Sequence, residues 1–60
     1  MIERVLGEEV YVGRRYGVGR VTEIGPPDHA TNLPKWIGVT PRVAGYQMKF
    51  APHNVQGWPG

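Results

Sequence analysis

Residues 35–56 read KWIGVTPRVAGYQMKFAPHNVQ and carry the pattern that decides the fold. An apolar run at Trp36–Val39 leads into a turn rich in Pro and Gly, after which apolar residues alternate from Tyr46 to Phe50. Alternation with a period of two is typical of a half-buried β-strand. The expected elements are, in order, a strand over 35–40, a strand over 45–50, one 3₁₀ turn over 51–54 and a last short strand at 55–56.

The rest of the chain is too rich in helix-breaking residues for helices of ordinary length. It holds nine Gly and six Pro among 60 residues, and in a helix interior Gly costs ~1 kcal/mol and Pro ~3 kcal/mol. Upstream, Val10 and Val12 alternate with polar neighbours in an expected strand over 8–12. A second strand is expected over 20–24, where Val21 and Ile24 lie three apart, so the pattern predicts a β-bulge.

A glycine-rich turn and a longer loop connect these strands. Residues 13–19 read GRRYGVG, in which glycines allow positive φ and let the side chains of Arg14, Arg15 and Tyr16 project. Residues 25–34 read GPPDHATNLP and are expected to form one long loop, a type of segment that is often functional in a small domain. The sequence thus predicts an all-β, five-stranded SH3-like barrel with one long loop and a single 3₁₀ turn before the last strand. It forms one domain over 1–60, with a core at about 7–56 and a tail at 57–60.

Size and charge point to a partner. A chain of this length buries only ~60% of the surface that its unfolded form exposes, so association with a larger protein or self-association is expected. The absence of Cys excludes a disulfide framework, and no apolar run is long enough to cross a bilayer. We therefore expect a cytoplasmic protein without a membrane partner. The net charge of +2 permits nucleic acid or an acidic protein as a partner.

The chain contains few residues of the types that catalyse reactions. Ser and Cys, the usual hydroxyl and thiol nucleophiles, do not occur. His29 and His53 lie far apart in the sequence, each near a proline, and are interpreted as surface imidazoles rather than metal ligands. Glu8 and Glu9 are adjacent on a strand and point to opposite faces, which prevents a close acid/base pair. We expect no catalytic residue, no metal site and no cofactor.

Binding is the remaining activity, and the exposed large residues suggest where it occurs. Basic and aromatic side chains are interleaved at the tip of the first turn, as in small barrels that hold nucleic acid. The long loop and the C-terminal tail add further polar and aromatic groups. The candidate binding residues are Arg14, Arg15, Tyr16, His29, Asn32, Trp36 and Trp58.

Four short motifs resemble a group of SH3-like barrels that act as electron-transport accessory proteins. They are Gly7-Glu8-Glu9-Val10, Gly17-x-Gly19-x-Val21, Asn32-Leu33-Pro34 and Phe50-Ala51-x-His53-x-Val55. The group includes the variable chain of ferredoxin-thioredoxin reductase, a small accessory chain of photosystem I, the nitrile hydratase β chain and type II dihydrofolate reductase. The resemblance implies a small non-catalytic accessory module docked on a larger protein, in a redox or phage-type assembly. The docking surface would be formed by the loop 25–34 and the tip Arg14–Tyr16.

Two alternatives remain open. The Gly-x-Gly-x-Val turn is also similar to KOW and Tudor-like barrels, which implies nucleic-acid binding. Two further motifs, Thr31-Asn32-Leu33 and Tyr46-Gln47-Met48-Lys49, resemble type II dihydrofolate reductase, which is an NADPH-dependent homotetramer. Gln47 and Met48 match two of its pore positions, but Lys49 stands where a Tyr is expected and Val12 where a Lys is expected.

Overall fold

The structure is a computed structural model that describes residues 5–58. Residues 1–4 and the last two tail residues, Pro59 and Gly60, lie outside the described part. The elements are β1 (Glu9–Tyr11), β2 (Val18–Ile24), β3 (Pro27–Asp28), β4 (Leu33–Pro34), β5 (Ile37–Pro41), β6 (Met48–Phe50), the 3₁₀ turn η1 (Pro52–Asn54) and β7 (Gln56–Gly57). For residues 5–58 the predicted all-β class is confirmed, as is one 3₁₀ turn before the last strand.

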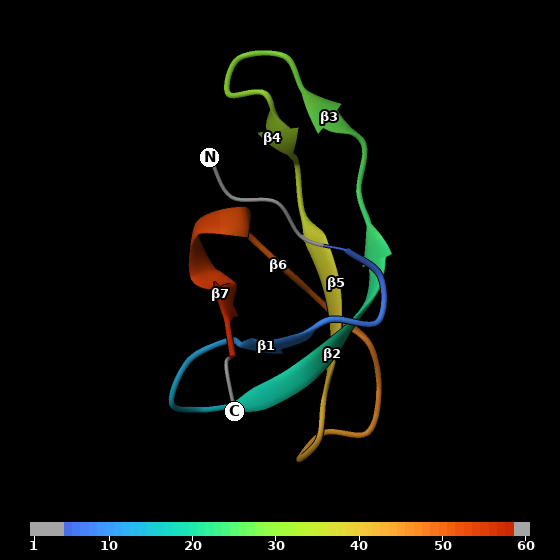
Figure 1. The fold of residues 1–60 in the computed structure, drawn as a ribbon, viewed down its shortest axis with the longest axis vertical. Coiled ribbons are helices and arrows are strands. Elements are labelled where there is room, and N and C mark those ends of the chain that lie inside the picture. The colour runs from blue at the N-terminus through green and yellow to red at the C-terminus, as the bar shows by residue number, and fades with distance from the viewer. Residues whose placement is uncertain (1–4, 59–60) are drawn as a thin grey trace.

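Five strands form the main sheet, in the order β6-β5-β2-β1-β7 (Figure 1). Each neighbouring pair is antiparallel. Within residues 5–58, the edge strands β6 and β7 do not pair with each other, so the sheet is not closed into a barrel. The number of main strands agrees with the prediction, whereas closure is not observed.

The turn between β1 and β2 has the geometry that its glycines suggest. The amide of Gly17 donates to the carbonyl of Gly13 at 2.7 Å, and the amide of Val12 donates to the carbonyl of Gly17 at 2.9 Å. Gly13 and Gly17 both have a positive φ, of 108° and 68°. Residues other than glycine rarely adopt such backbone angles. The turn therefore presents residues 14–16 at the end of the β1–β2 hairpin.

The predicted bulge is present in β2. The register with β5 shifts between Val21 and Glu23, which leaves Thr22 as the extra residue. Beyond the bulge Ile24 pairs with Ile37, but its side chain is exposed. The three-residue spacing of the apolar residues is thus explained by a bulge, although only Val21 of the two enters the core.

The core is small and consists almost entirely of valine. Its side chains are those of Val10, Val12, Val21, Ile37, Val39 and Val55, with Tyr16 and Phe50 packed against them. The six core residues come from β1, from the position directly after it, from β2 and β5, and from the link between η1 and β7. Tyr16 belongs to the β1–β2 turn and Phe50 to β6. The core therefore lies on one face of the main sheet, which we call its inner side.

All five predicted strands differ in their bounds from the observed ones. The second, expected over 20–24, begins at Val18, inside the predicted turn 13–19. The third is expected over 35–40 and ended by Pro41, but β5 begins at Ile37 and includes the buried Pro41, which pairs with Gly19. The fourth is expected from Gly45, but β6 begins at Met48 because the preceding turn continues, with the amide of Gly45 bonded to the carbonyl of Pro41 at 3.0 Å. As a consequence, Tyr46 is exposed.

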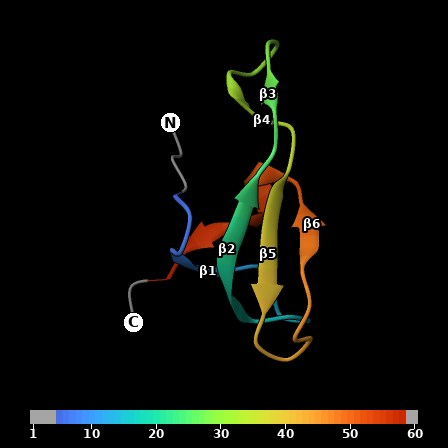
Figure 2. The same cartoon turned by 90° about the vertical axis from the view of Figure 1, so that its right-hand side faces the viewer.

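The predicted long loop over 25–34 is wrong, since this segment is a second hairpin, β3–β4. It extends the β2–β5 pair outward through hydrogen bonds from Gly25 N to Trp36 O (3.0 Å) and from Lys35 N to Pro26 O (2.8 Å). Its turn is held by Asp28, whose carbonyl accepts from Asn32 N at 2.8 Å and whose Oδ1 accepts from Ala30 N at 3.0 Å. Figure 2 shows this hairpin projecting beyond the ends of β2 and β5.

The first residue of the predicted tail, Gly57, belongs to the sheet, as part of β7. Gly57 pairs with Val10, and Gln56 pairs with Tyr11. The ring of Trp58 stacks on that of Tyr11, with centroids 5.7 Å apart and an interplanar angle of 20°. The last strand is therefore held against β1 by two residue pairs and one aromatic stack.

Candidate functional site

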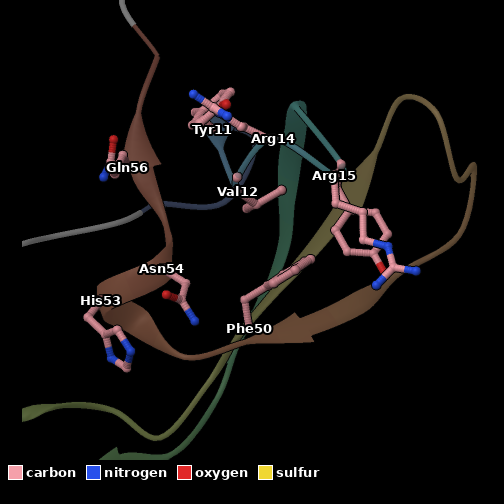
Figure 3. A pocket seen from close by; sticks show the side chains of 10 residues that line it. Tyr11, Val12, Arg14, Arg15, Phe50, His53, Asn54 and Gln56 are labelled. Carbon is pink, nitrogen blue, oxygen red and sulfur yellow. The ribbon is translucent and has the colours of Figure 1, made fainter.

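A pocket of about 360 Å³ lies between the β1–β2 turn and η1 (Figure 3). We call it the arginine pocket. Its lining comes from the first hairpin, the last residue of β6, the 3₁₀ turn and the final strand. The lining residues are Tyr11, Val12, Gly13, Arg14, Arg15, Tyr16, Phe50, His53, Asn54 and Gln56.

The rim on the hairpin side contains the three residues that the sequence places at the tip of the turn. Arg14 and Arg15 are exposed, and their side chains project to different sides of the pocket (Figure 3). Tyr16 is half-buried, and its ring packs edge-to-face on Phe50 with centroids 5.7 Å apart. The predicted grouping of Arg14, Arg15 and Tyr16 is thus present, with an aromatic floor beneath it.

The opposite rim is polar and is formed by η1 and β7. His53 and Asn54 belong to η1, which Pro52 begins at a position where no amide hydrogen is needed. Gln56 follows in β7 and pairs with Tyr11. The imidazole, the two side-chain amides and the aromatic rings give this pocket both hydrogen-bonding groups and apolar surface.

The lining of the arginine pocket, which is drawn from residues 5–58, contains no carboxylate. The nearby acid on β1, Glu9, forms an ion pair with Arg42, and Glu23 accepts a hydrogen bond from Gln47 at 3.2 Å. Among the described residues, Arg14 and Arg15 take part in no ion pair. Two guanidinium groups are therefore available to an anionic ligand.

A second, smaller pocket of about 190 Å³ lies on the other side of His53. We call it the proline pocket, because Pro34 of β4 and Pro52 of η1 face it together. Its lining residues are Asp28, Thr31, Leu33, Pro34, Lys35, Pro52 and His53. Since His53 lines both pockets, the two hollows adjoin at η1 and link the first hairpin to the second.

The remaining predicted binding residues do not gather in one place. His29 and Asn32 are exposed in the β3–β4 turn, line neither pocket, and Asn32 has a positive φ of 59°. Trp36 is half-buried on the outer side of the sheet, where the Nζ of Lys49 lies 4.4 Å from its ring centroid. Trp58 stacks on Tyr11 and so supports a wall of the arginine pocket without lining it.

The residues that resemble the reductase pore lie elsewhere on the molecule. The Nε2 of Gln47 donates to Thr22 Oγ1 at 3.0 Å and to Glu23 Oε1 at 3.2 Å, so its amide is occupied within the chain. Met48 is half-buried in β6. Lys49 lies above Trp36, and none of these three residues lines either pocket.

Sequence reasoning misses the part of the pocket that comes from the second half of the chain. The sequence predicts Phe50 on the apolar face of a strand and His53 at the surface, and it indicates no binding role for Asn54 or Gln56. A signal is present in the proline-initiated turn at 52–54, because a 3₁₀ turn before a last strand returns the chain toward the first hairpin. This signal does not indicate which side chains line the pocket between the turn and the hairpin.

Within residues 5–58 there is no group of three His, Asp or Glu side chains that could hold a metal ion. The same part of the chain contains no helix that is long and apolar enough to cross a membrane. Comparison of the chain with family models, with curated proteins and with solved structures found no significant match.

Proposed function

We propose that this chain is a small non-catalytic binding module that docks on a larger protein and accepts an extended segment of that partner beside η1. The observation that carries the proposal is the pair of pockets that adjoin at His53. One is bounded by the β1–β2 turn and the other by the β3–β4 hairpin, the two segments from which docking is expected. Together they provide room for more than one side chain of the same partner.

The topology supports the SH3-like resemblance on which this proposal draws. The main sheet has five strands, its last strand lies beside the first, and one 3₁₀ turn precedes the last strand. The hairpin β3–β4 occupies the position at which a long excursion is expected. By analogy with the accessory proteins of this group, such a module works by docking, although fold alone does not transfer an activity.

A selection of peptides tests the docking proposal directly. The full chain is presented to a random dodecapeptide display library, and the enriched peptides are titrated into ¹⁵N-labelled protein. We expect the largest amide shifts at 13–16 and 53–56, with a second set at 31–35. If no peptide is enriched, or if the shifts are concentrated in the β5–β6 turn, the proposal is wrong.

One observation favours a second candidate function, nucleic-acid binding. The arginine pocket combines two arginines with the rings of Tyr11, Tyr16 and Phe50, and single-stranded nucleic acid is held by such a combination of stacking and charge. Binding of a fluorescein-labelled octathymidylate should then weaken steeply between about 50 and 200 mM salt, to a degree set by the number of phosphates neutralised. Absence of binding at low salt would exclude this candidate.

A further inference from the structure

We propose that the segment accepted by the arginine pocket is an acidic peptide, in which one aromatic or apolar residue is flanked on each side by Asp or Glu. This inference rests on the proposed docking function and specifies its partner. Three features of the molecule support it: the charges around the pocket, the positions of the two arginines relative to Phe50, and the small extent of the basic surface.

The sign of the charge favours an anionic partner. The pocket presents two guanidinium groups without a carboxylate among its lining residues, and Arg14 and Arg15 have no ion-pair partner among residues 5–58. A basic segment would bring like charges together, which costs binding free energy. A carboxylate, by contrast, matches the planar donors of a guanidinium group.

The positions of the two arginines relative to the ring of Phe50 determine the order of acidic and apolar residues in the proposed peptide. Figure 3 shows Arg14 and Arg15 on different sides of the pocket, with the ring of Phe50 extending from β6 into the space between the β1–β2 turn and η1. Two separated arginines do not converge on one carboxylate. They instead fit two acidic residues, one on each side of a residue that contacts the ring of Phe50.

The limited extent of the basic surface favours a peptide over nucleic acid. Of the other described cations, Arg42 is paired with Glu9 and Lys49 lies over Trp36. Arg20 is exposed on β2 and lines neither pocket. The adjoining proline pocket is lined by the acidic Asp28 as well as by Lys35. A nucleic-acid strand requires several phosphates to be neutralised along its length, whereas the proposed peptide requires only two carboxylates to be matched.

Three fluorescein-labelled peptides test the inference by fluorescence anisotropy with the full chain. They are Gly-Asp-Asp-Phe-Asp-Asp-Gly, its counterpart with Asn in place of Asp, and its counterpart with Ala in place of Phe. We expect the acidic peptide to bind about tenfold more tightly than the Asn peptide, from two exposed ion pairs. The Ala peptide should bind more weakly than the Phe peptide.

Matched variants locate the effect on the protein. Arg15→Gln removes one cation of the pocket and should weaken binding of the acidic peptide about threefold, as expected for a single exposed pair. Arg20→Gln removes the same charge from an exposed position on β2 that lines neither pocket, and it should leave the affinity nearly unchanged. Circular dichroism verifies that both variants are folded.

The outcomes separate this inference from the docking function on which it rests. Equal affinities for the Asp and Asn peptides would overturn the acidic preference while leaving peptide docking supported. Equal losses in Arg15→Gln and Arg20→Gln would overturn the pocket assignment. Tighter binding of octathymidylate than of the acidic peptide in the same buffer would assign the surface to nucleic acid, and absence of binding by all three peptides would also overturn the inference.

Discussion

At the scale of single residues, two glycines are required for space rather than for their conformational freedom. A Cβ atom on Gly19 would lie 2.6 Å from Val39 Cγ1 and 2.9 Å from both Pro41 Cα and Thr40 O. The last two atoms belong to the backbone of β5, which cannot move without disturbing the pairing of β2 and β5. This close approach between neighbouring strands has no counterpart in the alternation of the sequence.

Gly19→Ala should therefore lower the free energy of unfolding by about 2 kcal/mol, the usual cost of overpacking a core. Because backbone atoms remain in the way, the cost should persist when Val39→Ala removes the nearest side-chain atom. Urea denaturation of the four proteins of this double-mutant cycle measures it. Relief of the cost in the Val39→Ala background would show that the backbone contact is unimportant.

At Gly25, in contrast to Gly19, we expect the cost of an added methyl group to largely disappear when the neighbouring side chain is removed. The atoms nearest to the position that an added methyl group would take all belong to the indole of Trp36, with Cδ2 and Cε2 at 2.6 Å and Nε1 at 2.9 Å. Gly25→Ala should cost about 1–3 kcal/mol in the natural sequence and much less once Trp36→Ala has removed the ring. A cost that is the same in both backgrounds, measured again by urea denaturation, would contradict this explanation.

At the scale of elements, β7 depends on very few contacts. It has two residue pairs with β1 and the stack of Trp58 on Tyr11. An aromatic pair contributes ~0.5–1.5 kcal/mol beyond the area that it buries. Trp58→Ala should thus accelerate hydrogen exchange at the amides of β7 more than at those of β5, and Trp58→Phe should restore much of the protection. Unchanged exchange in the Trp58→Ala variant would mean that the strand pairing alone holds β7.

The elements that the sequence predicts correctly are those defined by local apolar periodicity. Val10 and Val12 indicate one face of β1, and the spacing of Val21 and Ile24 indicates the bulge. The hairpin β3–β4 escapes prediction because Pro27 and Pro34, which face each other in it, lack the amide hydrogens of an ordinary strand. Asp28 is the available signal, since Asp favours turns in which its side chain accepts from a nearby backbone amide.

At the scale of the whole molecule, the candidate site can be predicted only in part. Arg14, Arg15 and Tyr16 adjoin in the sequence, so their grouping needs no knowledge of the tertiary structure. Phe50 reaches them through the pairing of β6 with β5, and His53 reaches them because the chain continues from η1 into β7, which pairs with β1. Such a juxtaposition depends on strand order, which local patterns do not encode.

The small size of the chain makes the whole molecule sensitive to a single core deletion. A chain of 60 residues has a total stability of about 3–9 kcal/mol, and its core contains one isoleucine among valines. Ile37 pairs with Ile24 on one side and with Phe50 on the other, and it is 1% exposed. Ile37→Ala should cost about 3 kcal/mol, a large part of that total.

We therefore expect Ile37→Ala to lower the midpoint of urea denaturation sharply and to leave a substantial unfolded population at physiological temperature. Val43→Ala serves as the control, because Val43 is 75% exposed in the β5–β6 turn and its loss should change stability by less than about 0.5 kcal/mol. A binding partner stabilises only the folded state, so the acidic peptide should raise the midpoint of Ile37→Ala as well. A loss of less than about 1 kcal/mol in Ile37→Ala would mean that the stability does not depend on the described core.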